Sequence, residues 1–342
     1  MRKFSLPFKI IVFYILLNLT IVIPLNKFIY NNIDKFYTIF KDEQRLYYYD
    51  KMPDLTMKAH WINKYYKTND FTIIMVGDSK VEDFYVKYED SIAAKLDRKL
   101  FGEKDTPFIF NFGSSGTKTV YVMERIKKAA EYNPDLIIWQ MGSGTYPSVN
   151  WVFPPSSKSY DLSLGGDLAG AYANIFKLND QNAPFISAEL RSNLIPLSRY
   201  STFFVEYFKG LKSKFRGTPL AYPNDPYLAI TEGSVPLPVF TEQTPFDAST
   251  RNFDAIGYIC KYVYEKGIPM MIYIDPIRQT VAQQKFEEGY YEKLIDAIKK
   301  EASPYGVPVL DLHTSVPDEL FIDGGHVKER GNEIVAQKLY EF

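Results

Sequence analysis

Apolar and polar positions alternate in blocks along two parts of the chain. Five short apolar runs are separated by polar stretches in which apolar residues recur with helical spacing. Continuous short runs of this kind predict strands that are buried on both faces, as in a parallel sheet. Repeated alternation of such strands with helices predicts an α/β fold, a doubly wound five-stranded parallel sheet with helices on both faces. We expect strands at 72–76, 108–112, 136–141, 269–274 and 307–310, and helices at 88–100, 118–131, 251–266, 281–302 and 327–340.

The alternation stops in the middle of the chain. Residues 142–250 are rich in Pro, Ser, Asn and aromatic residues, with helical spacing only at 168–177 and 199–213. A segment of this length within a compact domain usually serves a function. It leaves the strand at 136–141 at the edge where parallel strands end and ligands bind. We therefore expect residues 142–250 to form an inserted cap over that edge.

The N-terminal segment carries a different pattern. Arg2, Lys3 and Lys9 precede an apolar run at residues 10–25. As a helix this run would be about 24 Å long, close to the ~30 Å hydrocarbon core of a membrane. The positive flank predicts a cytoplasmic N-terminus. No small-residue cleavage site follows, which favours an uncleaved anchor. The alternative is a buried N-terminal helix of a soluble protein.

These patterns predict three regions. Residues 1–30 form a single-pass membrane anchor, residues 31–70 form a helical juxtamembrane stalk, and residues 71–342 form the α/β domain with its cap. The expected location is the cell membrane, with the body of the protein outside the cytoplasm.

Composition excludes several classes of function. The 342 residues carry 40 basic and 41 acidic side chains, a net charge of −1, and this balance does not suggest a nucleic-acid partner. The only cysteine is Cys260, so neither an intramolecular disulfide nor a cysteine metal cluster can form. No metal-ligand spacing or dinucleotide-binding glycine pattern occurs, and we expect neither a metal nor a cofactor.

The first candidate for chemistry is Gly77-Asp78-Ser79, directly after the predicted strand at 72–76. Ligands bind at the carboxyl ends of parallel strands. Backbone N–H groups at the start of the next helix would stabilise an oxyanion there. Taken alone, the same residues are also typical of a plain turn or a helix cap.

The second candidate is Asp323-Gly324-Gly325-His326, just before the last predicted helix. Across two glycines, the aspartate can orient the imidazole, which can then act as a general base. The alternative is a helix-capping Asp323 and a surface His326. A third, weaker motif is the glycine-rich segment 111–117, whose sequence is NFGSSGT and which suits a loop that cradles an anion.

Together the three motifs resemble those of the SGNH (GDSL-like) hydrolases. Residues 71–145 and 251–342 carry Gly-Asp-Ser, Asn-x-Gly-x-x-Gly and Asp-x-x-His in the order found in that superfamily. The resemblance implies a flavodoxin-like three-layer sandwich. It also implies roles for Ser79 as nucleophile, His326 as general base, Asp323 as the acid that orients it, and Gly116, whose N–H would join that of Ser79 in the oxyanion hole.

One motif of the superfamily is altered. Where the family has Gly-x-Asn-Asp after the third strand, this chain has Gly142-Ser143-Gly144-Thr145, so Gly144 replaces the asparagine that donates to the oxyanion. Loss of one such donor costs about 3–4 kcal/mol in a hydrolase. Ser143, Thr145 or Asn150 could compensate. Together with the anchor, this change makes the chain resemble membrane-anchored envelope members such as alginate acetyltransferases and the teichoic acid D-alanylation protein.

The resemblance implies a serine esterase or O-acyltransferase that acts through an acyl-serine on an ester of a cell-envelope glycan. A lipid ester would also suit the membrane position, and a transferase would have a membrane-bound acyl-donor protein as partner. The alternative is a catalytically silent envelope scaffold or glycan-binding protein. Two further substrate-binding candidates each have a plainer alternative: Trp151 either stacks on a sugar or packs in the core of the cap, and His313 either lines the site or is an ordinary loop residue.

Overall fold

The computed structural model describes most of the α/β domain. Its main described ranges are 23–32, 71–83, 85–86, 88–104, 107–113, 119–142, 241–247 and 252–342, with single residues or pairs within 9–21, 208–216 and 237–240. Residues 33–70 of the stalk predicted at 31–70 lie outside these residues, as do most of the cap predicted at 142–250 and half of the anchor predicted at 1–30. Near the N-terminus the described helix is α2 (Ile23–Asn31). None of the helices in these ranges is long and apolar enough to cross a membrane.

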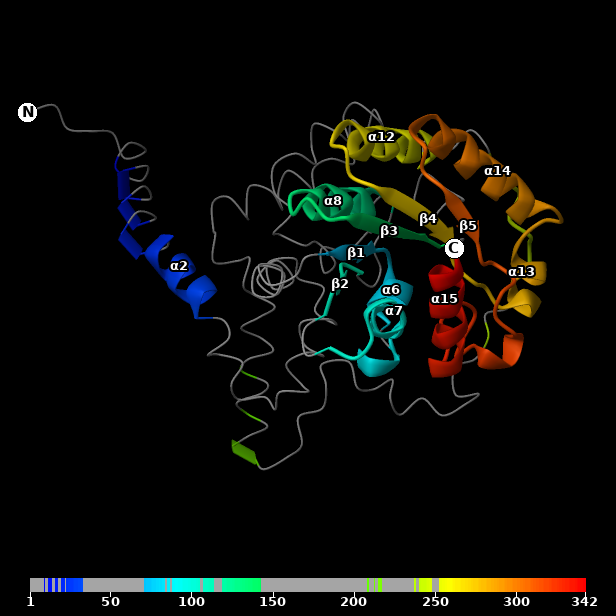
Figure 1. Cartoon of the computed structure of the whole chain (residues 1–342), viewed down its shortest axis with the longest axis horizontal. Helices are drawn as coiled ribbons and strands as arrows, with labels where there is room; N and C mark the ends of the chain where they lie inside the picture. Colours follow the sequence, from blue (N-terminus) through cyan, green and yellow to red (C-terminus); the bar gives the residue numbers. More distant parts are fainter. Residues whose placement is uncertain are drawn as a thin grey trace, which may run out of the picture.

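Five parallel strands form one sheet, as the apolar runs predict (Figure 1). Each strand agrees with a predicted run to within two residues at either end. All strands are parallel, so the loops after β1 and β3 open at the same edge, and the strand order β2-β1-β3-β4-β5 places the topological switch point between these two strands. The strands are β1 (Ile73–Val76), β2 (Ile109–Asn111), β3 (Leu136–Met141), β4 (Met270–Ile274) and β5 (Val309–Asp311).

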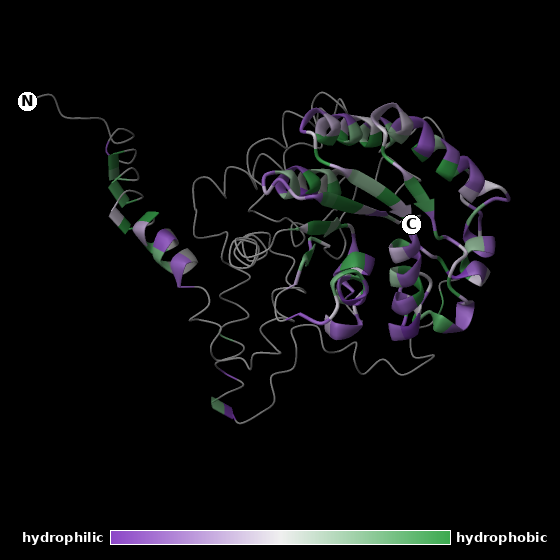
Figure 2. Cartoon of the chain, viewed as in Figure 1, coloured by the Kyte–Doolittle hydropathy of each residue, from purple (hydrophilic) through white to green (hydrophobic). Residues whose placement is uncertain are grey.

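Helices cover both faces of the sheet. Strand residues alternate between two apolar clusters: Ile74 and Val76 belong to one, and Ile73 and Met75 to the other. The helices show hydrophilic residues beside hydrophobic ones, consistent with one buried side and one solvent side (Figure 2). The first cluster lies under α8 (Thr119–Ala130), α12 (Asn252–Glu265) and α14 (Tyr290–Ala302), and the second under α7 (Ile92–Phe101) and α15 (Glu329–Glu341).

The prediction of a single helix at 281–302 is wrong. The chain instead forms α13 (Gln279–Lys285) and α14, with Phe286 extended and Gly289 at φ +74° between them. Phe286 is 3% exposed and forms a bridge with Thr244. Tertiary burial of this ring therefore interrupts the helical pattern, and the glycine permits the left-handed turn.

One predicted helix starts later than expected, and short helices lie in the loops between the main elements. At 88–100 the expected helix begins only at Ile92, because the Ser91 hydroxyl caps α7 by accepting from the N–H of Ala94. Four short elements complete the described helices: α6 (Ser79–Glu82), η4 (Tyr88–Asp90), η10 (Ser303–Tyr305) and η11 (Asp318–Leu320).

Candidate active site

Ser79 is the first residue of α6, directly after a tight turn that leaves β1. The Asp78 side chain caps the helix, with Oδ1 accepting from the N–H of Lys80 at 2.9 Å. The N–H of Asp78 donates to Oε1 of Gln140 on β3, at 3.0 Å. A β-carbon on Gly77 would lie only 2.3 Å from this Oε1. The turn therefore needs glycine before Asp78, and it fixes Ser79 at the carboxyl edge of the sheet.

Ser79, His326 and Asp323 form a continuous chain of hydrogen bonds. The Ser79 Oγ atom lies 2.7 Å from His326 Nε2, within the range expected for a nucleophile and its base. His326 Nδ1 lies 2.7 Å from Asp323 Oδ2. With a neutral imidazole, Nδ1–H donates to Asp323 and Nε2 accepts the hydroxyl proton of Ser79. The three residues that the sequence singled out thus meet in the order that a Ser-His-Asp triad requires.

The environment of Asp323 keeps it ionised. Burial alone would raise the pKa of Asp323, but the hydrogen bond and charge of His326 and the backbone N–H groups hold it at about 2. Those N–H groups belong to Gly325 and His326, and each donates to Asp323 Oδ1 at 2.8 Å. An acid fixed by three donors and charged at neutral pH can hold the imidazole in one tautomer.

The two glycines between Asp323 and His326 lie against neighbouring elements. A β-carbon on Gly324 would lie 3.3 Å from Cγ1 of Val281, on α13. One on Gly325 would lie 3.0 Å from Cε of Lys80. The Gly324 carbonyl also accepts from the N–H of Arg278 at 3.4 Å. The turn is therefore held between α6 and the start of α13, which positions the His326 ring.

Three residues near the triad escaped the sequence analysis. Lys80 Nζ donates to the carboxylate of Asp275, which follows β4 and is 1% exposed. The ring of Tyr85 lies 4.6 Å from that of His326, centroid to centroid. Asp275 could have been found, because it directly follows an apolar run just as the Gly-Asp-Ser motif does. Tyr85 carries no comparable signal in the sequence.

Of the other predicted site residues, the structure describes His313. Gly116, Ser143, Thr145, Asn150 and Trp151 lie outside the described residues, so their roles stay predictions. His313 follows β5, where its Nδ1 lies 2.7 Å from Asp311 Oδ1 and its ring stacks on Tyr291. Within the described part of the chain, no hydrogen bond joins His313 to Ser79 or His326. Nor do three His, Cys, Asp or Glu side chains gather there as ligands for a metal.

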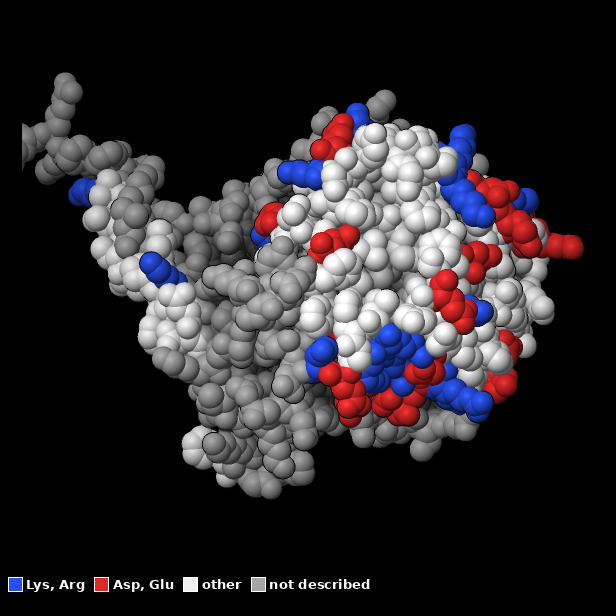
Figure 3. All heavy atoms as spheres, viewed as in Figure 1, with Lys and Arg blue, Asp and Glu red and all other residues white. Residues whose placement is uncertain are grey.

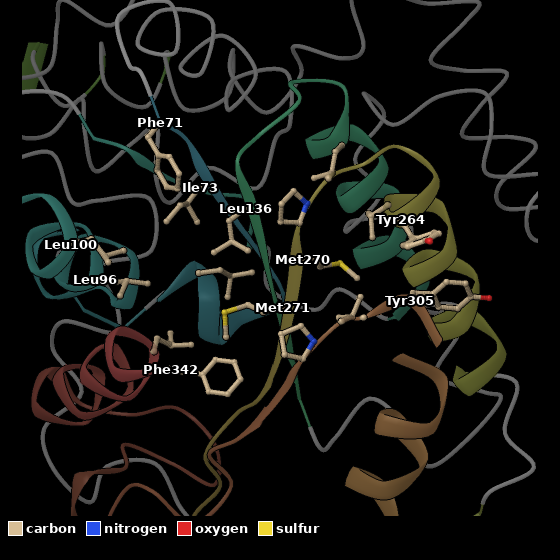
Figure 4. A pocket seen from close by; sticks show the side chains of 18 of the residues that line it. Phe71, Ile73, Leu96, Leu100, Leu136, Tyr264, Met270, Met271, Tyr305 and Phe342 are labelled. Atoms are coloured by element: carbon tan, nitrogen blue, oxygen red, sulfur yellow. The ribbon is translucent and has the colours of Figure 1, made fainter. Parts of the chain in front are cut away.

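A large apolar pocket lies at the opposite edge of the sheet (Figure 4). Its volume is about 880 Å³, and none of its described lining residues is charged. It is lined by the starts of strands, including Ile73, Leu136 and Met270, together with Phe71 and Phe342. Because Ser79 follows the carboxyl end of β1, this pocket does not serve the Ser79–His326 pair.

Charged side chains on the face shown in Figure 3 are interspersed by sign. Basic and acidic residues adjoin each other along α7 and α15, where Lys99 pairs with Glu333 at 2.5 Å. The described residues on this face therefore form no basic stripe of the kind that binds nucleic acid.

Comparisons with known proteins do not place the chain in a family. No family model matches it, and no curated protein matches it either. One solved structure shares 13% identity, covering 79% of this chain and 94% of its own, with a TM-score of 0.41. Another, an acetyl xylan esterase named AlAXEase, shares 12% identity over 79% of this chain and 98% of its own, with a TM-score of 0.40. Likeness at this level assigns neither family nor activity.

Proposed function

We propose that this chain is a serine ester hydrolase or O-acyltransferase in which Ser79 carries the acyl group. The observation that carries the proposal is the hydrogen-bonded chain from Ser79 Oγ through His326 to Asp323, with 2.7 Å at both junctions. It lies at the carboxyl edge of a parallel sheet, where this fold class binds its ligands. The resemblance of the three sequence motifs to SGNH hydrolases supports the same chemistry.

In the first half-reaction, the Ser79 oxygen attacks the carbonyl carbon of an ester while His326 Nε2 takes the hydroxyl proton. The carbonyl oxygen becomes an oxyanion, and Asp323 stabilises the imidazolium. Collapse of the tetrahedral intermediate breaks the bond to the alcohol oxygen. The alcohol leaves with the proton returned by His326, and the acyl group stays on Ser79.

In the second half-reaction, His326 removes a proton from the acceptor as its oxygen attacks the acyl-serine. Water as acceptor gives a free acid, and a glycan hydroxyl gives a new ester. In both cases Ser79 leaves with the proton from His326, so the enzyme returns to its starting state. A transferase must exclude water from this step, which would give the cap at 142–250 its purpose.

The oxyanion needs donors from more than one element. The N–H of Ser79 belongs to the first turn of α6, where backbone N–H groups have no partner within the helix. Gly116 is the proposed second donor. Gly144 supplies no side chain, so Ser143, Thr145 or Asn150 is the proposed third donor. If none of these donates, the site stabilises the oxyanion transition state by about 3–4 kcal/mol less than a site with an asparagine.

For the substrate we propose an acyl ester of a cell-envelope glycan or lipid, reached from a membrane anchor at residues 10–25. The support is the charged flank before a single apolar run. A membrane-bound acyl-donor protein would then be the partner of a transferase. The location is tested by reporters fused after residue 342. Alkaline phosphatase activity is expected there, and fluorescence from a green protein that folds only in the cytoplasm would contradict it.

The activity is tested by labelling with a fluorophosphonate probe, which forms a covalent bond to an activated serine. Wild-type protein should be labelled, and Ser79→Ala should not. Ser315→Ala is a matched control, because its hydroxyl also lies on a loop after a strand but donates to the carbonyl of Leu312. It should be labelled like wild type. Absence of wild-type labelling in folded protein would reject the enzyme and favour the catalytically silent scaffold, which the missing asparagine already favours.

A further inference from the structure

A lysine and an aspartate distant in sequence meet beside the triad. Lys80 follows Ser79 directly, and its Nζ donates to Oδ2 of Asp275 at the end of β4. The side chains are 16% and 1% exposed. The other oxygen of Asp275, Oδ1, is buried without a hydrogen-bond partner among the described residues. Lys80 is therefore the side-chain partner of a buried carboxylate, which holds the lysine in place.

The same ammonium group faces the turn that carries His326. A β-carbon on Gly325 would lie 3.2 Å from Lys80 Nζ, and Gly325 directly precedes His326. Burial lowers the pKa of Lys80, while the carboxylates of Asp78 and Asp323 oppose this. Contact with Asp275 also favours the charged form. The charged groups around this turn come from four elements: Asp323 from the turn itself, Asp78 and Lys80 from the start of α6, Asp275 from the end of β4, and Lys285 from α13.

We propose that Lys80 is a positioning residue of the active site, anchored by Asp275, whose positive charge keeps His326 in its neutral, proton-accepting form at lower pH. The proposal rests on the function proposed above for its consequence in catalysis. The effect of the Lys80 and Asp275 charges on the His326 ring, however, can be measured without any substrate.

The sign of the effect follows from charge. A nearby cation disfavours a second cation, so Lys80 opposes the protonation of His326, whereas Asp275 offsets this effect. Three carboxylates, those of Asp78, Asp275 and Asp323, would otherwise favour the imidazolium and remove the base. Lys80 is held close to the triad on one side by its place next to Ser79 and on the other by the buried Asp275.

The test is the pH dependence of fluorophosphonate labelling, measured as a second-order rate constant from acid to neutral pH. In Lys80→Met the acid midpoint should rise by roughly half to one pH unit, because a positive charge is lost. Lys80→Arg keeps the charge and should leave the midpoint near that of wild type. In Asp275→Asn a negative charge near the His326 turn is lost, so the midpoint should fall.

A matched control is available on α7. Lys95 is 11% exposed and pairs with Asp90 at 3.0 Å and with Glu333 at 3.6 Å, and among the described residues it forms no ion pair with Asp323 or Asp275. Lys95→Met should lower the net charge by the same amount without moving the midpoint. A purely structural Lys80–Asp275 pair would slow labelling in both single variants but would not move their midpoints in opposite directions. Equal midpoints in wild type, Lys80→Met and Asp275→Asn would overturn the proposal.

A second readout separates this proposal from the proposed activity. The chain has three histidines, so the imidazole signals of isotope-labelled protein can be assigned by NMR with a His326→Gln variant. The titration midpoint of the His326 ring should shift upward in Lys80→Met and downward in Asp275→Asn. If wild type is not labelled by the probe but the ring midpoints shift, the activity fails and the inference about charge stands. If labelling occurs and the ring midpoints do not shift, the inference fails alone.

Discussion

The described part of the chain contains two Asp–His pairs with nearly the same geometry and different surroundings. Nδ1 of His326 lies 2.7 Å from Asp323, and Nδ1 of His313 lies 2.7 Å from Asp311. The two histidine side chains are also similarly exposed, at 22% and 17%. Each aspartate has a lowered pKa, although burial alone would raise it, because its histidine donates to it. In the aspartate–histidine contact itself, the two sites are almost equivalent.

They differ in what lies at the edge of each ring that carries Nε2. His326 Nε2 meets the Ser79 hydroxyl at 2.7 Å, at the start of a helix. His313 stacks on Tyr291 at an interplanar angle of 4°, and among the described residues no side-chain hydroxyl bonds to its Nε2. Its backbone carbonyl accepts from Ile277 and Gln279, which ties the loop to the start of α13. An Asp–His pair is therefore not a catalytic base by itself, because the group at Nε2 decides what the imidazole can do.

The largest expected difference between the two pairs is in reactivity at Ser79. His326→Ala should slow fluorophosphonate labelling by about 10³-fold or more, because Ser79 loses its base. His313→Ala should change it by less than about twofold, since surface changes away from the reacting atoms act only through stability. Labelling rates of both purified variants at neutral pH test this. Equal losses of labelling rate in His326→Ala and His313→Ala would show that the two Asp–His pairs do not differ in their effect on Ser79.

The next effect concerns the acids. Asp323→Asn should slow labelling by about 10²-fold, less than His326→Ala, because the turn still holds the ring while the tautomer is no longer fixed. Asp311→Asn should leave labelling unchanged. The labelling rates are compared at several pH values, so that a shift of the pH–rate profile is not mistaken for a loss of reactivity. A greater loss in Asp323→Asn than in His326→Ala would contradict the assigned roles.

The tyrosine beside each histidine should act in a different way. Tyr85→Ala should slow labelling about three- to tenfold, because the His326 ring loses a packing partner and is less well oriented. Tyr291 is 6% exposed, so Tyr291→Ala should lower the free energy of unfolding by about 3 kcal/mol and leave labelling nearly unchanged. Urea unfolding and labelling of both variants separate the effects. If Tyr291→Ala slows labelling more than Tyr85→Ala, the proposed division between positioning and packing is wrong.

The smallest effect is on acid stability. The pKa of Asp323 is about 2 in the folded protein, below the value near 3.9 of an unfolded aspartate. Asp323 thus contributes stability that is present above about pH 4 and is lost as the pH falls toward 2. We expect a contribution of about 1–2 kcal/mol, reduced by partial exposure. Urea unfolding at pH 5 and pH 2.5 should therefore show a smaller loss on acidification in Asp323→Asn than in wild type, whereas equal losses would contradict the lowered pKa.

Much of the fold was predictable because the relevant signals are local. Each of the five strands is a short apolar run, and the runs predict their positions because a strand buried on both faces needs apolar residues throughout. Gly77 and the Gly324-Gly325 pair were visible for a similar reason. Each occupies a turn where neighbouring side chains leave little room for a β-carbon. The break between α13 and α14 was missed, because it depends on where the Phe286 ring is buried.

The sequence by itself determined the elements of the sheet and offered Ser79, Asp323 and His326 as candidates, since burial pattern and turn chemistry are properties of neighbouring residues. Only the tertiary structure decided which histidine meets Ser79, across 247 positions of the chain. It also decided that Lys80 meets Asp275, across 195 positions. Such contacts depend on strand order and on how closely loops from different strands approach one edge of the sheet. The spacing of residues along the chain specifies neither the strand order nor the distance between these loops, because parallel strands bring their loops together only when the whole sheet forms.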